Sequence, residues 1–220
     1  MDFYLRVGTL AGSDKVYLDF GAGRAAWFED DDNPLRHSMR LVKGRFKEVI
    51  ATDIDPIVLE NLSCDRAVLM QDNKVPLEDA SVDVIVADYV LEHIPDPKAF
   101  EAEVRRLLKP GGMFCARTPH KASYVALLAR LMDGPIEDFI MRFAQPDRKE
   151  EDIFPKHYKM NTLGSIKNVF ADWEDSSFMA RTDPAYYFGR KFIYYCFDVL
   201  HRIMPKAFSA NIFVFLRKPN

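Results

Sequence analysis

Two glycines with an acidic residue just before them are the first feature of the chain that suggests chemistry. Asp19 precedes Gly21 and Gly23, which stand where the apolar run Val16–Phe20 ends. Glycine lets the backbone approach a ligand closely because no Cβ intrudes, and amides that follow a strand can receive an anionic group. A second acid, Asp53, ends the next apolar run, where a carboxylate can accept both hydroxyls of a ribose. Together these residues predict a site for a cofactor that contains adenosine.

The elements that position these side chains are short β-branched runs bounded by turn residues. Such runs are typical of buried parallel strands. Four are clear and a fifth is weaker: Val16–Phe20, Val49–Thr52, Val82–Ala87 and Met113–Thr118, then Ala67–Met70. In α/β proteins ligands bind at the carboxyl ends of such strands.

Segments with helical periodicity lie between and after these runs. Pro97–Leu108 carries apolar residues at helical spacing opposite a charged face, and Pro56–Leu62 is shorter. Strand and helix in alternation imply right-handed crossovers. We therefore expect one α/β domain over residues 1–220, with a doubly wound, Rossmann-like, seven-stranded, mostly parallel sheet and an antiparallel last strand. The later elements that we expect are helices over Ala122–Met132, Ile136–Ala144, Thr162–Phe170 and Phe188–Met204, an edge strand over Phe178–Arg181 and the last strand over Asn211–Leu216.

Four stretches between residues 15 and 120 point to one family. They are VYLDFGAGR, VIATDIDP, MQDNKVPLEDASVDVIVADYVLEHIPDP and AFEAEVRRLLKPGGMFCARTP. They resemble, in this order, four segments of class I S-adenosylmethionine (SAM) methyltransferases of the methyltransferase-11 type. The first two correspond to the family's first motif and to its ribose-binding strand end. The third corresponds to the segment from the adenine-contacting acid to the short helix after the fourth strand, and the last to the fourth helix with the fifth strand. The resemblance implies an enzyme that transfers a methyl group from SAM.

The resemblance assigns the first part of the site to residues that match the family's motifs. Gly21 and Gly23 would line the methionine part of SAM, with Asp19 near its amino group. Asp53 would bind the ribose, and Ile54 would pack on the adenine. On the residues alone, Asp53 has an alternative as the cap of the helix over Pro56–Leu62.

The second part of the implied site lies further along the chain. Asp72 would reach the adenine amine, helped by the backbone at Asn73, while Asp88 and Tyr89 would lie beside the sulfonium. A turn role for Asp72 and a capping role for Asp88 are the structural alternatives.

The first crossover departs from the family pattern. Ala25 stands where the third glycine is usual, and Asp53 lies 30 residues after Gly23, where about 20 is usual. The excess corresponds to an acidic insertion, Glu29–Pro34, which we expect to displace or shorten the first helix. We expect its acidic run, Glu29–Asp32, to be a solvated loop.

The acceptor side carries a fainter resemblance, to methyltransferases of bacterial glycan and cell-envelope biosynthesis. It implies a helical cap over residues 119–160, inserted after the fifth strand between core segments 15–118 and 161–220. We expect a small-molecule or glycan acceptor and O-methylation without a metal ion. A hydroxyl acceptor benefits from a nearby base, and the catalytic candidates are His157, His120 and Asp88.

Two other readings remain open at the level of sequence. The segment from Gly21 to Ala26 also fits the G-x-G-x-x-G/A pattern of nicotinamide dehydrogenases, although Asp19 and the block from Asp72 to Ile94 speak against it. A methyltransferase-like fold that binds without catalysing is the other reading, because a fold alone never fixes a function.

Composition excludes several classes of protein. With 48% apolar and 29% charged residues the chain is globular, and its net charge of −3 lacks the basic footprint of a nucleic-acid binder. The chain has no run of about 18 apolar residues for a membrane span and no signal-peptide pattern. Three scattered cysteines suit neither a disulfide framework nor a zinc site, so we expect a cytoplasmic protein. The oligomeric state is left open.

The last forty residues differ from the rest of the chain. Residues 181–220 carry seven basic and two acidic residues and ten of the 28 aromatics, whereas residues 1–180 carry a net charge of −8. We expect the helix over Phe188–Met204 to pack on a sheet face and Asn211–Leu216 to close the sheet edge. A remaining basic and aromatic face would allow weak contact with a membrane surface or a lipid-linked acceptor; its basic residues are Arg190, Lys191, Arg202 and Lys206.

Overall fold

The computed structural model describes residues 2–30, 32–123, 155–182 and 190–220. The helices expected over Ala122–Met132 and Ile136–Ala144, and with them most of the expected cap over 119–160, lie outside the described residues. Among the helices that are described, none is both long enough and apolar enough to cross a membrane.

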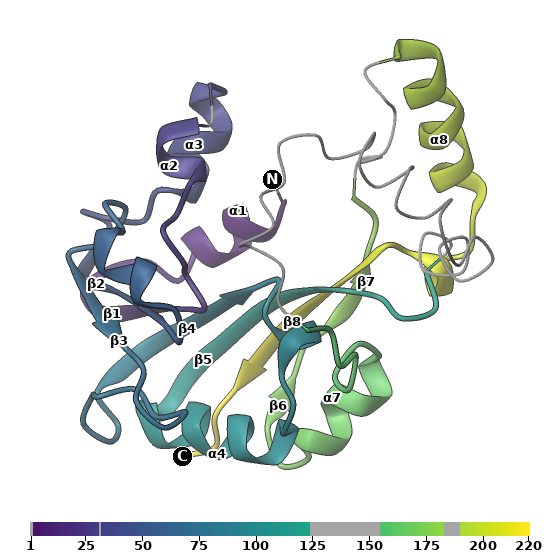
Figure 1. The fold of residues 1–220 in the computed structure, drawn as a ribbon. Coiled ribbons are helices and arrows are strands. Elements are labelled where there is room, and N and C mark those ends of the chain that lie inside the picture. Colours follow the sequence, from purple (N-terminus) through teal and green to yellow (C-terminus); the bar gives the residue numbers. More distant parts are fainter. Residues whose placement is uncertain (1, 31, 124–154, 183–189) are drawn as a thin grey trace.

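One twisted sheet organises the molecule (Figure 1). Its strand order is β3-β2-β1-β4-β5-β8-β6, with β7 also paired to β8. The first five strands run parallel and β8 runs antiparallel to β5. The strands are β1 Gly12–Phe20, β2 Phe46–Asp53, β3 Arg66–Leu69, β4 Val82–Asp88, β5 Leu108–Pro119, β6 Glu174–Asp175, β7 Phe178–Ala180 and β8 Asn211–Arg217.

This confirms the expected doubly wound sheet with an antiparallel last strand. The sheet has eight strands where seven were expected, because the edge is divided into the short strands β6 and β7. The last strand also does not form the edge: β8 lies inside the sheet, between β5 and these two short strands.

The described helices are α1 Asp2–Gly8, α2 Trp27–Asp30, α3 Pro34–Arg40, α4 Pro97–Leu107, α7 Leu163–Val169 and α8 Lys191–Ile203, with 3₁₀ turns η1 Pro56–Glu60, η2 Leu91–His93 and η4 Lys206–Phe208. As expected, the first crossover has no single long helix. Asn33 accepts a hydrogen bond from the Arg36 amide and Pro34 fixes the first turn, so the chain starts a second short helix there. Part of the expected loop, up to Asp30, is instead the helix α2.

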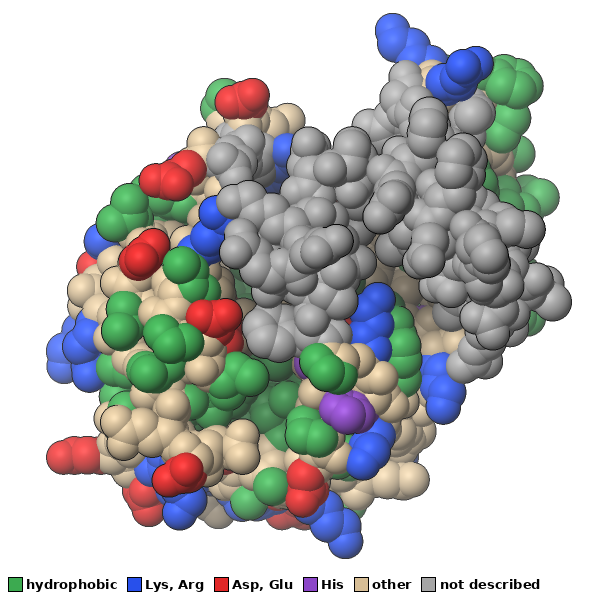
Figure 2. All heavy atoms as spheres, in the orientation of Figure 1, with side chains coloured by type: hydrophobic (Ala, Val, Ile, Leu, Met, Phe, Trp, Pro, Cys, Tyr) green, Lys and Arg blue, Asp and Glu red, His purple; other side chains and the backbone are tan. Residues whose placement is uncertain are grey.

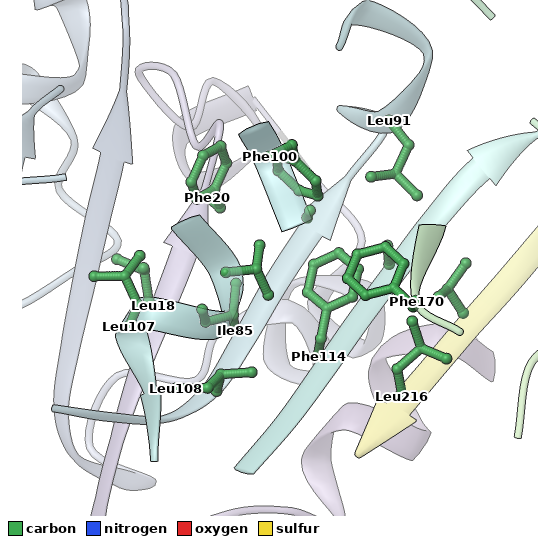
Figure 3. Close-up of a cluster of buried hydrophobic side chains, with 14 of the residues drawn as sticks. Leu18, Phe20, Ile85, Leu91, Phe100, Leu107, Leu108, Phe114, Phe170 and Leu216 are labelled. Carbon is green, nitrogen blue, oxygen red and sulfur yellow. The ribbon is translucent and has the colours of Figure 1, made fainter. Parts of the chain in front are cut away.

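Two hydrophobic cores lie on opposite faces of the sheet, because successive side chains of a strand point to opposite faces. On one face α4 and α7 cover a cluster that includes Phe100, Phe114 and Phe170 (Figure 3). On the other, α1 places Phe3 in full burial beside Phe213. The carboxyl ends of the parallel strands are thereby held rigidly in a row.

The long C-terminal helix does not pack on the sheet, and that expectation is wrong. α8 stands away from both faces (Figure 1), and Phe192 and Ile203 are 78% and 75% exposed. The helix joins β7 to β8, which are antiparallel neighbours. Such a connection need not cross the sheet, unlike the crossover between two parallel strands.

Candidate functional site

The glycine turn after β1 is fastened to the end of β2. The amides of Gly21 and Ala22 donate to the Thr52 carbonyl oxygen at 2.8 and 3.1 Å. The Gly23 amide donates to Asp53 Oδ2 at 2.9 Å, and Asn61 Nδ2 donates to the Gly23 carbonyl oxygen at 3.0 Å. Two parallel strand ends are therefore locked together at the place where the sequence predicts the cofactor.

The two glycines are required for different reasons. Both have positive φ, 72° for Gly21 and 51° for Gly23. A Cβ on Gly21 would lie 2.5 Å from Val90 Cγ2, whereas a Cβ on Gly23 would meet nothing within 4 Å. Gly21 therefore permits close packing against the segment after β4, and Gly23 leaves open space above the turn.

Ala25 adopts a left-handed backbone conformation, which glycine takes up more readily than alanine. Its φ is 54°, a left-handed conformation that costs an alanine about 1–2 kcal/mol. Strained residues of this kind concentrate at functional sites.

Asp53 holds the turn and keeps acceptor capacity. Besides Gly23, it accepts a hydrogen bond from the Asp55 amide on Oδ1 at 3.1 Å. A carboxylate offers about four lone-pair positions, so two remain for a ligand. The cap of η1 is Asp55, which accepts from the Ile57 amide, so the capping alternative for Asp53 is wrong. Ile54 follows with 58% of its side chain exposed.

Asp19, near the end of β1, is in an unfavourable place for a negative charge. Burial raises the pKa of Asp19 to about 7; nearby Arg40 lowers it, and the charges of Asp88 and Asp53 raise it further. A ligand cation placed here would favour the ionised form.

The predicted adenine contact lies on a tight turn after β3. Asp72 and Asn73 both have positive φ, and Gln71 and Lys74 exchange two backbone hydrogen bonds across them. This is the arrangement of a two-residue hairpin turn that requires left-handed residues. The Met70 amide donates to the Asp53 carbonyl oxygen at 2.9 Å, so this turn is adjacent to the end of β2. Asp72 thus has both the turn role and a place beside the other candidates.

Asp88, at the end of β4, is the centre of a buried polar network. Its two oxygens accept from Arg117 Nε and Nη2 at 2.7 Å each, and Oδ2 also accepts from Tyr4 Oη at 2.7 Å. Arg40 Nη2 lies 3.8 Å from Oδ2. The Asp88 side chain is only 7% exposed. These contacts favour Asp88 as a positioning group over Asp88 as a proton acceptor.

Tyr89, the neighbour of Asp88, faces the open side of the network. Its φ is 59° and it is 41% exposed. The Arg117 guanidinium carbon lies 4.6 Å from the centre of its ring, and its hydroxyl donates to Asn211 Oδ1 at 3.2 Å. The ring is therefore fixed between β5 and β8.

Sequence reasoning missed three members of this network: Tyr4 on α1, Arg40 on α3 and Arg117 on β5. The signal for Arg117 was a lone charged residue inside the apolar run of β5. Asp88 and Arg117 are register partners in the β4–β5 ladder, which no sequence pattern specifies.

The candidate bases on the acceptor side have opposite environments. His120 is 7% exposed after β5, and its Nδ1 has no hydrogen-bond partner among the described residues. Burial lowers the pKa of His120, against a hydrogen bond with the Ser209 backbone. His157 is exposed, and its amide donates to the Glu92 carbonyl oxygen at 2.7 Å.

Glu92, which carries that backbone contact, belongs to a buried polar group that the sequence did not reveal. Its Oε2 accepts from Thr118 Oγ1 at 3.0 Å, and Asn161 Nδ2 donates to Thr118 Oγ1 at 2.6 Å. Burial raises the pKa of Glu92. The group connects η2, the end of β5 and the segment around residue 160, beneath the acceptor side.

Along the segments that the structure describes, no group of three or more His, Cys, Asp or Glu side chains has the arrangement of a metal site. Figure 2 shows hydrophobic side chains recessed near the middle of this face of the molecule.

Comparison with known proteins shows which part of this chain resembles a known family. Residues 34–116 match the family described as methyltransferase domain. A probable SAM-dependent methyltransferase of Mycobacterium tuberculosis is 33% identical over 105 residues, which are 46% of this chain and 37% of the relative. Another from Mycolicibacterium smegmatis is 45% identical over 51 residues, 23% of this chain and 20% of the relative. The matches thus span well under half of these relatives.

Solved structures agree on the fold. A SAM-dependent methyltransferase of Methanosarcina mazei has a TM-score of 0.62 at 17% identity and covers 100% of this chain and 99% of its own. The YcgJ protein of Bacillus subtilis has a TM-score of 0.58 at 16% identity, with 100% and 99% covered. Part of this chain is therefore similar in sequence to SAM-dependent methyltransferases, and its fold is that of the solved structures.

Proposed function

We propose that the chain transfers a methyl group from SAM to a hydroxyl of a small-molecule or glycan-type acceptor, without a metal ion, in the cytoplasm. The observation that carries the proposal is the row of carboxylates on neighbouring strand ends. Asp53 clamps the glycine turn and keeps free acceptor positions, and beside it Asp19 has a raised pKa that a bound cation would reverse. The cysteines of the described residues are free thiols, which suits a reducing compartment.

The residues present fit SAM. Asp19 suits its ammonium group, and the open space above Gly23 suits its methionine part. Asp53 suits the ribose hydroxyls, and the exposed side chain of Ile54 suits one face of the adenine. Asp72 lies on the turn next to them, in reach of the adenine end. When bound, SAM supplies a methyl group that its sulfonium already activates.

The chain's own part in the reaction is mainly positioning. The Asp88–Arg117 pair holds Tyr89 at the end of β4, and the Gly21 turn packs against Val90, the residue that follows Tyr89. A hydroxyl acceptor must lose its proton as it attacks. We assign that proton to a histidine of the acceptor side: His157, which is exposed, or His120, whose pKa burial lowers.

Calorimetric titration with SAM and with S-adenosylhomocysteine tests the cofactor assignment. Asp53→Ala is expected to weaken SAM binding at least tenfold, because it removes the ribose acceptor and frees the Gly23 amide. Asp53→Asn keeps one acceptor oxygen, so its SAM affinity is expected to lie between those of wild type and Asp53→Ala. Asp14→Ala, at an exposed acid of the same sheet, is the matched control. Unchanged affinity in folded Asp53→Ala would refute the ribose role.

Methyl transfer to a panel of hydroxyl-bearing acceptors tests the reaction. Product with wild type and at least a tenfold lower kcat for His157→Ala or His120→Ala, with SAM affinity retained, is the expected result. SAM binding without turnover on any hydroxyl, amine or carbon acceptor would favour a binding module instead.

A further inference from the structure

The outward side of α8 is an apolar stripe. Phe192, Val199 and Ile203 recur at helical spacing and are 78%, 56% and 75% exposed, and Tyr195 beside them is 63% exposed. In Figure 2 hydrophobic side chains follow the outer edge of this helix. Phe208 on η4, the turn that follows the helix, is 42% exposed. Contiguous apolar surface of this kind marks an interaction site.

The opposite side of α8 is anchored to the body of the protein. His201 is 8% exposed and its Nδ1 lies 3.0 Å from the Thr182 carbonyl oxygen. Arg181 Nη2 donates to the carbonyl oxygen of Met204, the residue after the helix, at 3.0 Å. The stripe is therefore held outward by specific contacts on the inner face.

Basic residues surround the stripe. Arg190 and Lys191 stand at the start of α8, Arg202 near its end and Lys206 on η4, and all four are exposed. The one acidic residue of α8 is Asp198, which is ion-paired with Arg202 at 2.9 Å. This surface is positive on a chain whose first 180 residues carry a net charge of −8.

We propose that α8 and η4 dock this protein on an anionic membrane surface. A helix with an apolar face and Lys or Arg beside it lies in the plane of the lipid headgroups, with the apolar face inserted. Anionic lipids attract the basic residues within a Debye length. Contact with a second copy through the same stripe is disfavoured, because an antiparallel pair would bring Lys191 toward Arg202 of the other copy.

Docking would also orient the methyltransferase site. α8 projects on the side toward which β4 and β5 run (Figure 1), so the strand ends that hold the candidate cofactor residues would lie near the lipid surface. The docking proposal itself does not depend on methyl transfer and is tested separately from it.

Flotation with vesicles tests the proposal on the full chain. Wild type is expected to bind phosphatidylglycerol–phosphatidylcholine vesicles at low salt and to bind pure phosphatidylcholine vesicles at least fivefold less. The double variant Phe192→Ser/Ile203→Ser removes the stripe, and Lys191→Glu/Lys206→Glu removes the charge. Each is expected to lower the bound fraction at least fivefold.

The matched controls are Leu35→Ser, at a leucine that is 54% exposed on α3, and Lys98→Glu, at an exposed lysine on α4. Both are expected to bind vesicles like wild type. SAM titration of every variant separates this proposal from the proposed function: lost vesicle binding with intact SAM affinity supports docking.

Two results would overturn the proposal. One is the absence of binding to anionic vesicles at low salt by folded, SAM-binding wild type. The other is a dimer in light scattering that Phe192→Ser/Ile203→Ser dissociates, because the stripe would then be occupied by a second copy.

Discussion

Helices α4 and α8 are both amphipathic in sequence, but the apolar face of α4 is buried and that of α8 is exposed. In α4, Phe100, Val104 and Leu107 recur at helical spacing and are 6%, 0% and 0% exposed. In α8, Phe192 and Ile203 follow the same periodicity and are 78% and 75% exposed. Periodicity shows that a helix has an apolar face, but not what that face meets.

Connectivity explains the difference. α4 joins β4 to β5, which are parallel neighbours, so the chain must return along the sheet and the helix covers one face. α8 joins β7 to β8, which are antiparallel, so the chain is free to leave the sheet between them. The parallel half of the molecule therefore holds the candidate cofactor residues, while the antiparallel half can present a surface.

The largest expected effect tests whether the two apolar faces differ in stability. Phe100 packs edge-on against Phe20 and Phe114 at ring distances of 5.3 and 5.8 Å. Phe100→Ala should lower the free energy of unfolding by about 3–5 kcal/mol, through lost burial and a cavity. Phe192→Ala, the matched change on α8, should alter it by less than about 0.5 kcal/mol. Urea unfolding measures both.

Similar losses in the two variants would break the comparison, since α8 would then be part of the core. A higher free energy of unfolding for Phe192→Ala would sharpen the comparison. It would show that the exposed phenylalanine contributes nothing to the stability of the fold.

The second prediction compares an ion pair from each half. Asp88–Arg117 is buried, at 7% and 18% side-chain exposure, whereas Glu174–Arg217 between β6 and β8 is 74% and 58% exposed. Asp88→Asn places an amide donor against Arg117 and should cost about 2–4 kcal/mol, because it leaves a buried charge unpaired. Glu174→Gln should change the free energy of unfolding by less than about 0.5 kcal/mol. Thermal unfolding at low and high salt distinguishes them, and equal losses would contradict the assignment of Asp88 as a positioning group.

The sequence predicts the parallel half well because its signals are local. The strands β2 and β4 follow from apolar runs, and α4 follows from its periodicity. β1 begins at Gly12, earlier than Val16, because Gly12 still pairs with Phe46 of β2 ahead of an irregularity in the register. Propensity cannot show such pairing.

The features that the sequence did not predict depend on residues that are distant from one another along the chain. Tyr4, Arg40 and Arg117 meet at Asp88 only when α1, α3 and β5 are in place. The outward face of α8 required knowing that its neighbours are antiparallel. Both failures are failures of register and connectivity, which no local pattern encodes.

The smallest expected effect concerns a site residue that lowers the stability of the fold. Its substitution should raise the free energy of unfolding, whereas the first two predictions lower it. Burial raises the pKa of Asp19 to about 7 in the folded state, from 3.8. Between these values the native state binds more protons than the unfolded state, so the stability from this group is full below pH 3.8 and is lost as pH rises through 7. Asp19→Asn should therefore add about 1–2 kcal/mol at pH 8, with allowance for solvent screening, and almost nothing at pH 4.

The same substitution should weaken SAM binding at least tenfold at pH 8, since the neutral amide cannot pair with the cofactor's ammonium group. Wild-type affinity should itself fall as pH drops below 7, where Asp19 takes up a proton. Asp14→Asn, at an exposed position of the same strand, should move neither quantity. Thermal unfolding and calorimetry from pH 4 to pH 8 measure both effects. An Asp19→Asn variant that loses stability at pH 8, or that binds SAM like wild type, would show that Asp19 is an ordinary structural acid. Higher stability together with weaker SAM binding would show that the parallel half gives up folding stability at its candidate binding site. The exposed face of α8, by contrast, leaves the stability of the core unchanged.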